Sequence, residues 1–220
     1  MKFAEASPSP RVFGVFAASL LLSLTGLRAA PATTEYRGFT IDESHIKNLS
    51  EIAEMRAATK EQIDMVHAVG LSAETLKFFQ TVPFELVPAG TFRSPTPGVY
   101  GNRVVKVSTG IIKIGHKPVL LHELLHAYHD QRLSKGTRNP AVIGFYDKAK
   151  TLGAYAAKSH MMENPNEFFA CSATAYLFGV TAQEPFKRDK VKTSQPELFA
   201  YLKALFGSDA GDYAGSLTRS

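Results

Sequence analysis

Between Asp42 and Val69, apolar residues recur at steps of three and four positions among charged residues. This spacing places the apolar side chains on one face of an α-helix, so the segment predicts an amphipathic helix that stops at Gly70. Ser72, followed by AETLKFFQ, has the pattern of an N-cap and a short second helix. Residues 33–40 lack this periodicity and predict an irregular lead-in.

From Pro83 onward the chain changes to short, β-branched runs separated by glycine and proline. Residues 83–88, 102–108 and 110–115 each predict a β-strand. The two prolines within 94–98 predict a loop, because prolines so close together exclude regular structure. The segment 83–115 is the only part of the chain that the sequence predicts to form a sheet.

The helical spacing returns after Pro118 and continues through most of the remaining chain. Helices followed by a small mixed sheet and further helices indicate an α+β fold in one domain, residues 33–220. Its expected parts are a helical N-terminal part at 42–80, the sheet at 83–115, the helices of 118–180, and a C-terminal helix and tail at 181–220. The individual helices expected in the second half are 118–133, about 140–158, 165–179 and 196–206.

The first residues have the organisation of a secretory signal peptide. Lys2 and Arg11 precede an apolar run at 12–24, and Ala30 and Ala32 supply the small residues of a cleavage site. The run is too short to span a bilayer comfortably. We therefore expect residues 1–32 to be a signal peptide and the mature protein to be secreted, extracellular or periplasmic, without stable membrane association. An uncleaved anchor is the alternative.

Composition and charge narrow the class of partner. With 45% hydrophobic and 20% charged residues among 220, the chain can bury a core of ordinary size. Its formal net charge is only +5, and the densest basic stretch, residues 187–192, is short. We therefore expect no nucleic-acid partner. We also expect a monomer. Cys171 is the single cysteine, so no internal disulfide can form, and its apolar helical surroundings favour a small buried side chain over a nucleophile.

The strongest chemical signal is the sequence HELLH at positions 122–126. On a helix, His122 and His126 lie roughly 40° apart on one face and about one turn apart along the axis. Two imidazoles so placed can bind one Zn²⁺ ion, and the adjacent Glu123 can take a proton from a water at an open coordination position. The alternative is a helix whose histidines face solvent and bind no metal.

His129 shares this helix face but lies about 10 Å from His122 along the axis, so it cannot join both histidines around one ion. If His126 and His129 were the metal-binding pair instead, Glu123 would have no catalytic role. We expect His129 to line the cleft or to contact a ligand, and Asp130 to orient a ligand imidazole. The alternative for both is a solvated helix end.

A catalytic zinc site needs a third protein ligand. A histidine six residues past the second would fall at Arg132, so the extended three-histidine motif is absent. Glu167 is the best candidate because it falls in the first turn of a helix whose next residues form a strongly apolar face. Either the helix dipole holds this carboxylate or a positive charge does. Glu163, just before the helix, is the rival.

The motifs LLHELLHAYHD and NPNEFFA, some forty residues apart, resemble the gluzincin metallopeptidases. Within that group they are most similar to the branch of anthrax lethal factor and the Pro-Pro endopeptidases, over about residues 83–180. The resemblance implies a zincin-like catalytic domain with one zinc ion bound by His122, His126 and Glu167, and Glu123 as general base.

The resemblance also implies a β-strand beside the cleft that pairs with an extended protein or peptide substrate, for which residues 102–108 or 110–115 are the candidates. The chain departs from the branch where a tyrosine usually stabilises the oxyanion, because His160 stands seven residues before Glu167. A protonated imidazole can also donate to developing negative charge. We therefore expect His160 first, and Tyr155 second, in this role.

A second departure follows Glu167 by four residues, where an acid often orients a ligand histidine in gluzincins. This chain has Cys171 there, so Asp130 or Asp147 would have to replace the acid, or metal affinity falls. These patterns together predict a secreted zinc metalloendopeptidase. The alternatives are a catalytically weak or inactive zinc-binding secreted effector module on the same fold, and a helical protein with incidental histidines and no zinc.

Overall fold

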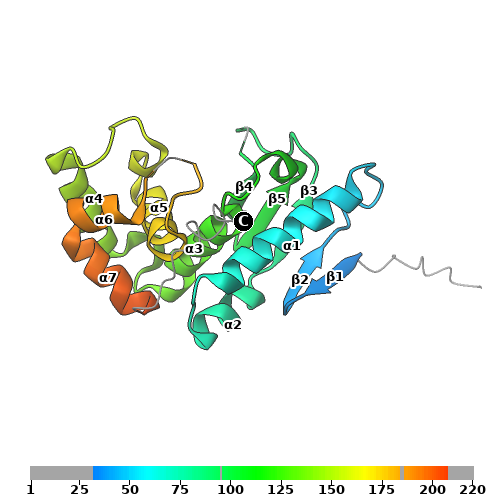
Figure 1. The fold of residues 1–220 in the computed structure, drawn as a ribbon, viewed down its shortest axis with the longest axis horizontal. Helices are drawn as coiled ribbons and strands as arrows, with labels where there is room; N and C mark the ends of the chain where they lie inside the picture. Colours follow the sequence, from blue (N-terminus) through cyan, green and yellow to red (C-terminus); the bar gives the residue numbers. More distant parts are fainter. Residues whose placement is uncertain (1–31, 95, 184–185, 208–220) are drawn as a thin grey trace, which may run out of the picture. The chain divides into compact units, whose positions relative to one another are not determined.

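A computed structural model describes residues 32–94, 96–183 and 186–207 of the chain. The expected signal peptide therefore lies outside the described residues, except for Ala32. In the part of the chain that is described, several helices accompany one small mixed sheet, which confirms the predicted α+β class (Figure 1). No helix of these ranges is both long and apolar enough to cross a membrane.

The sheet has five strands in the order β1-β2-β3-β5-β4. Strand β3 pairs in parallel with β2 on one side and with β5 on the other, whereas the outer strands β1 and β4 pair antiparallel with β2 and β5. This arrangement leaves β1 and β4 at the two edges. The strands are β1 Thr33–Tyr36, β2 Phe39–Asp42, β3 Phe84–Val87, β4 Gly98–Gly101 and β5 Val104–Ser108.

The expectation of an irregular lead-in at 33–40 is wrong, because these residues form most of the β1–β2 hairpin. Arg37 and Gly38 turn the chain with φ of 48° and 83°, the left-handed pair that suits a two-residue hairpin. Strand β1 is polar and only half-buried at the sheet edge, so no apolar run marks it in the sequence.

Two expectations for the region 83–115 also need correction. Residues 110–115 do not form a strand, since a 3-10 helix, η1, covers Thr109–Lys113 and buries Ile111. A short apolar run does not by itself distinguish a strand from a helical turn. Conversely, β4 begins at Gly98, the last residue of the expected loop, and reaches β5 through Asn102 and Arg103, both with positive φ.

The first helix, α1, covers Ile52–Ala68 and so starts ten residues later than Asp42. The intervening residues form turns, one of them fixed by a hydrogen bond of 2.8 Å from the Ser44 backbone N–H to the Asp42 carboxylate. The second helix, α2, covers Ala73–Thr81, and Ser72 caps it as predicted by accepting from the Thr75 N–H.

The second half of the chain is helical, as predicted, but two boundaries differ. Helix α4 ends at Leu152 rather than at 158, because Gly153 takes a left-handed conformation and stops it. Most of the basic stretch 187–192 lies in the short helix α6, which was not among the expected helices. The helices are α3 Val119–Arg132, α4 Pro140–Leu152, α5 Pro165–Phe178, α6 Arg188–Ser194 and α7 Pro196–Phe206, with 3-10 turns η2 Gly136–Arg138 and η3 His160–Met162.

Helix α3 connects the sheet to the helices of the second half of the chain. It contacts β4, β5 and α1 on one side and α5 on the other (Figure 1). Every residue of α5 from Phe168 to Phe178 is buried, so this helix forms the centre of the apolar core against which α3 packs. Because α3 is covered by other elements along most of its length, its side chains have well-defined positions.

Candidate metal centre

The start of helix α3 is fixed by a side chain from helix α1. Pro118 precedes the helix and has no side chain that can cap it. The buried Gln62 takes over this function, because its Nε2 donates to the Lys117 carbonyl at 2.7 Å and its Oε1 accepts from the Leu120 N–H at 3.0 Å. These bonds satisfy free backbone groups at the helix end and set the position of the residues that follow.

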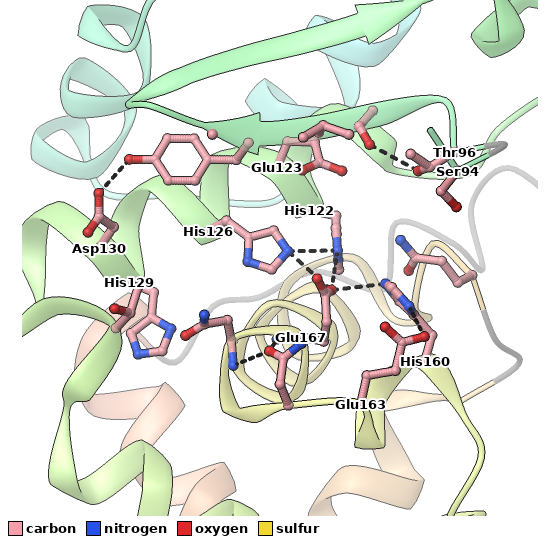
Figure 2. Close-up of a pocket in the computed structure, with 18 residues that line it drawn as sticks. Ser94, Thr96, His122, Glu123, His126, His129, Asp130, His160, Glu163 and Glu167 are labelled. Carbon is pink, nitrogen blue, oxygen red and sulfur yellow. Dashed lines mark hydrogen bonds and ion pairs between the residues drawn. The ribbon is translucent and has the colours of Figure 1, made fainter. Parts of the chain in front are cut away.

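Three side chains from α3 and α5 meet at one point (Figure 2). The Nε2 atoms of His122 and His126 are 3.1 Å apart, and each is 3.2 Å from Oε2 of Glu167. The structure therefore brings together the three residues expected to bind a metal. The rival candidate Glu163 has an exposed carboxylate that contacts His160.

Glu167 is held by the local structure of the α5 N-terminus. Asn164 caps the helix by accepting from the N–H groups of Asn166 and Glu167, and Pro165 occupies the first helical position. Pro at this position is preorganised for a helix start. The carboxylate of Glu167 thus points toward α3 from the first turn of a helix that is otherwise buried.

The spacing of these three atoms fits a zinc ion. Ligand atoms at about 2.0–2.1 Å from a tetrahedral Zn²⁺ lie roughly 3.3 Å from one another, and the three distances here are 3.1, 3.2 and 3.2 Å. Two imidazole nitrogens and one carboxylate oxygen are also among the ligands that zinc takes in catalytic sites. The donor set therefore suits zinc in chemical type and in separation.

Electrostatics at this point also favour a cation. Burial raises the pKa of Glu167, but the hydrogen bonds from His122, His126 and His160 outweigh burial and hold this pKa well below its usual range. Burial lowers the pKa of His122, which keeps the imidazole in the neutral form that binds metals. An ionised carboxylate between imidazoles attracts either a proton or a metal ion.

Glu123 lies beside the three-atom cluster but is not part of it. Its side chain is buried against strand β4, and a Cβ atom placed on Gly98 would lie 2.9 Å from Cγ and 3.0 Å from Oε1 of Glu123. The carboxylate lines the same cavity as the cluster (Figure 2). It is therefore positioned to act on a molecule in the cavity rather than to bind the metal.

His160, in η3, lies on the opposite side of Glu167. Its Nε2 is 2.9 Å from Oε2 of Glu167, and its Nδ1 is 3.0 Å from Oε1 of Glu163. The hydrogen bond to Glu167 raises the pKa of His160 to about 9, burial opposes this shift, and Glu163 adds to it. His160 is thus an imidazolium at neutral pH that lines the cavity next to the cluster.

Tyr155 does not reach this cavity. It follows Gly153, where α4 ends earlier than expected, and its ring packs against Phe168 and Phe186 with centroid separations of 6.3 and 5.2 Å. Burial raises the pKa of Tyr155 to about 12. Of the two candidates for oxyanion stabilisation, the structure brings only His160 to the site.

The acids expected to orient a ligand histidine have other positions. Asp130 accepts a hydrogen bond of 2.7 Å from the hydroxyl of Tyr100, and Asp147 is exposed on α4. The Nδ1 atom of His122 is buried without a hydrogen-bond partner among the described residues. The thiol of Cys171, one turn after Glu167, is buried, and it offers a ligand atom within 4.8 Å of those of His122 and Glu167.

The cavity above the cluster has a volume of about 510 Å³ and runs along strand β4. Because β4 is the last strand of the sheet, its outer edge faces away from β5. The expectation that residues 102–108 or 110–115 pair with a substrate beside the cleft is therefore wrong. The first segment contains β5, which is an inner strand, and the second contains part of the 3-10 helix η1. Besides the expected site residues, the cavity is lined by Ser94, Thr96, Gly98, Val99, Tyr100, Gly101, Thr137, Asn164, Asn166 and Gln183.

Few of these additional residues could be predicted from the sequence. Tyr100 is the most informative of them, since it joins the edge strand to α3 by its bond to Asp130 and accepts a hydrogen bond of 3.0 Å from Gln131. The close glycines at 98 and 101 were a possible signal, because glycine inside a strand often marks a close approach of another group. The two prolines just before Gly98 predicted a loop instead, so this indication of a strand was missed.

Comparisons with known proteins add a fold similarity only. No protein-family model matches the sequence, and the search of curated proteins finds no match. Among solved structures, the chain is similar to the PRO-PRO endopeptidase from Paenibacillus alvei, with 23% sequence identity over 76% of this chain and 97% of that chain, and a TM-score of 0.41. At this identity and TM-score the similarity assigns neither activity nor residue roles.

Proposed function

We propose that the protein is a zinc-dependent metalloendopeptidase of the gluzincin type, secreted through a signal peptide at residues 1–32. The observation that carries this proposal is the meeting of His122, His126 and Glu167 at 3.1–3.2 Å, beside the buried carboxylate of Glu123. Zinc, when bound by these three residues, would polarise a peptide carbonyl and make water a stronger acid.

The chain's own residues supply the proton transfers. Glu123 accepts the proton of the attacking water and then gives it to the leaving amine, which is general base followed by general acid catalysis. The imidazolium of His160 donates a hydrogen bond to the oxygen that becomes negative in the transition state. Its Nε2 lies 2.9 Å from Oε2 of Glu167, so this donor is next to a residue that would hold the metal, which supports the role.

Strand β4 supplies the binding surface for the substrate. An extended peptide would add to its outer edge by main-chain hydrogen bonds, in the way that strands are added to exposed sheet edges. The bond from Tyr100 to Asp130 ties β4 to α3. This tie fixes the separation of the peptide-binding edge from the helix that carries Glu123.

Replacing Glu123 with Gln tests the proposal. The Gln side chain keeps the shape of Glu but cannot accept a proton, so we expect kcat to fall by roughly 10²–10⁴-fold with one zinc ion still bound. Peptide-library cleavage followed by mass spectrometry measures the activity, and metal analysis of the same samples measures the zinc. A Glu123→Gln variant that cleaves as fast as the parent would refute the mechanism.

A second candidate function is a secreted zinc-binding module without peptidase activity. The observation that favours it is also the position of His160, whose ring centroid lies 6.0 Å from that of His122. A third imidazole bound to the ion would close the position that a catalytic site keeps open. One residue thus separates the two functions.

The variant His160→Ala distinguishes them. If His160 stabilises the oxyanion, kcat falls by about 10²–10³-fold and zinc affinity changes little. If His160 is a fourth ligand, zinc affinity falls and peptide cleavage does not. Zinc affinity is measured by competition with a chromogenic chelator, and X-ray absorption of the zinc-loaded parent counts its imidazole ligands.

A further inference from the structure

His129 is a buried histidine for which the proposed reaction has no use. Its side chain is 1% exposed, and neither ring nitrogen has a hydrogen-bond partner among the described residues. One face of the ring packs against Phe169 with a centroid separation of 4.8 Å. An apolar side chain would fill this position without leaving polar atoms unpaired, so packing alone does not explain a histidine here.

The ring nevertheless reaches the cavity. His129 is one of the residues that line it, one helical turn beyond His126 and therefore displaced along α3 from the metal cluster (Figure 2). Burial, with a smaller effect of His126, lowers the pKa of His129 to about 4. At neutral pH the ring thus offers the cavity one N–H donor and one nitrogen acceptor.

A second unpaired atom lies on the facing helix. Oδ1 of Asn166 is buried and has no hydrogen-bond partner in the described part of the chain, and Asn166 also lines the cavity. Asn166 precedes Phe169 by three residues on α5, so the two lie on the same helix face, and Phe169 is the residue that contacts His129. One region of the cavity wall thus presents a donor and two acceptors.

The surrounding charges narrow the class of group that fits. The described residues that line the cavity include no lysine or arginine, and the imidazolium of His160 already pairs with Glu163 and Glu167. Glu123 and Asp130 add two more carboxylates, so an anionic group is disfavoured. A cationic group would leave the N–H of His129 unpaired. The carboxylate of Asp130 already accepts from Tyr100. An uncharged group that both donates and accepts can pair with the N–H of His129 and with Oδ1 of Asn166.

We propose that His129 and Asn166 form a specificity subsite that binds the side-chain carboxamide of a glutamine or asparagine residue of the substrate. The carboxamide oxygen accepts from the His129 N–H, and its NH₂ group donates to Oδ1 of Asn166. This inference rests on the proposed peptidase function, since it names a preference of the same cavity.

Cleavage kinetics of matched peptides test the subsite. Zinc-loaded protein first digests a peptide library, and sites cleaved beside a Gln or Asn are resynthesised with Leu at that position. We expect the kcat/KM ratio of the Gln peptide to the Leu peptide to exceed 10 for the parent and to fall at least tenfold in His129→Leu. The Leu peptide should still be cleaved, because the metal ligands and Glu123 are unchanged.

Three further variants make the result specific. His129→Gln keeps a donor and an acceptor and should restore part of the preference. Asn166→Ala should weaken the preference independently of His129. His45→Leu, at an exposed histidine outside the cavity, is the matched control and should leave the ratio unchanged. A ratio in His129→Leu equal to that of the parent would overturn the proposal, whatever the absolute rates.

A binding experiment separates this proposal from the peptidase function. If zinc-loaded parent protein cleaves no peptide, the proposed activity fails, and the subsite is tested with the Gln and Leu peptides on the Glu123→Gln variant. Nuclear magnetic resonance of ¹⁵N-labelled histidine follows the His129 ring, assigned by its loss in His129→Leu. A shift with Gln peptides but not Leu peptides supports the subsite. No shift with either means that only water pairs with the ring, and refutes it.

Discussion

Glycine at position 98 should be required for full activity, because its missing side chain leaves space for Glu123. A Cβ atom at this position would lie 2.8 Å from Cγ1 of Val119, 2.9 Å from Cγ of Glu123 and 3.0 Å from its Oε1. Gly98 is not among the glycines with positive φ, so alanine can adopt its backbone conformation. The effect of Gly98→Ala therefore comes from these contacts alone.

The structure sets the size of the effect. Ordinary contacts to a Cβ atom begin at 3.4 Å, so Cγ of Glu123 or the strand itself has to move by about 0.5 Å. A displacement of about 1 Å can reduce an enzymatic rate roughly 10²-fold. We therefore expect Gly98→Ala to lower kcat about tenfold, which corresponds to about 1.4 kcal/mol of transition-state stabilisation.

Steady-state kinetics on a cleaved peptide, together with metal analysis, measure this effect. Zinc content should stay at one ion per chain, because the residues that the methyl group of Ala at position 98 would contact, Val119 and Glu123, are not the proposed metal ligands. Gly144→Ala on α4 is the matched control, since a Cβ there meets no atom within 4 Å. A Gly98→Ala variant with unchanged kcat would show that the position of Glu123 against β4 does not matter for the reaction.

Three further outcomes are expected. Gln62→Leu should lower the unfolding free energy in urea by about 1–3 kcal/mol, because the buried Leu120 N–H loses its partner and the Lys117 carbonyl keeps only its bond from the Val119 N–H; a loss below about 0.5 kcal/mol would contradict this. Burial raises the pKa of Glu43, but hydrogen bonds, that from Arg56 the largest, lower this pKa overall. The ionised carboxylate therefore stabilises the fold at pH values above the ordinary pKa of a glutamate, and this stabilisation is lost on acidification. The difference in unfolding free energy between the parent and Glu43→Gln should shrink from pH 7 to pH 3. Chelation should lower Tm and added zinc should restore it; the corresponding gain in unfolding free energy is about 2.7 kcal/mol at a hundredfold excess of zinc over its Kd.

The local part of the candidate site could be predicted from the sequence. His122 and His126 meet because a helix fixes the separation of residues four apart, so their relation requires no knowledge of the fold. The prediction of Glu167 as the third ligand also used a local feature of the sequence, a carboxylate in the first turn of a capped helix that is otherwise apolar. What the sequence did not contain was the packing of α5 on α3 that brings the three atoms together.

Boundaries set by single residues were predictable only in part. Gly70 and Ser72 separate α1 from α2 as expected, whereas Gly153 ends α4 before a run that remains helical in its composition. That early end places only one of the two candidates for the oxyanion, His160, in the cavity. A helix continuing to 158 would have placed Tyr155 on a regular face, but the chain leaves α4 at Gly153, buries Tyr155 against Phe186, and brings His160 to Glu167.

The edge strand beside the cavity shows why the rest was not predictable. Strand β4 has only four residues, two of them glycine, and nothing in GVYG distinguishes it from a loop. It is a strand because Val105 and its neighbours in β5 pair with it, and it borders the cavity because Tyr100 bonds to Asp130. Neither interaction involves a residue of the HELLH motif itself. The motif therefore predicts a class of reaction, whereas the surface that would select a substrate depends on contacts between segments far apart in the sequence.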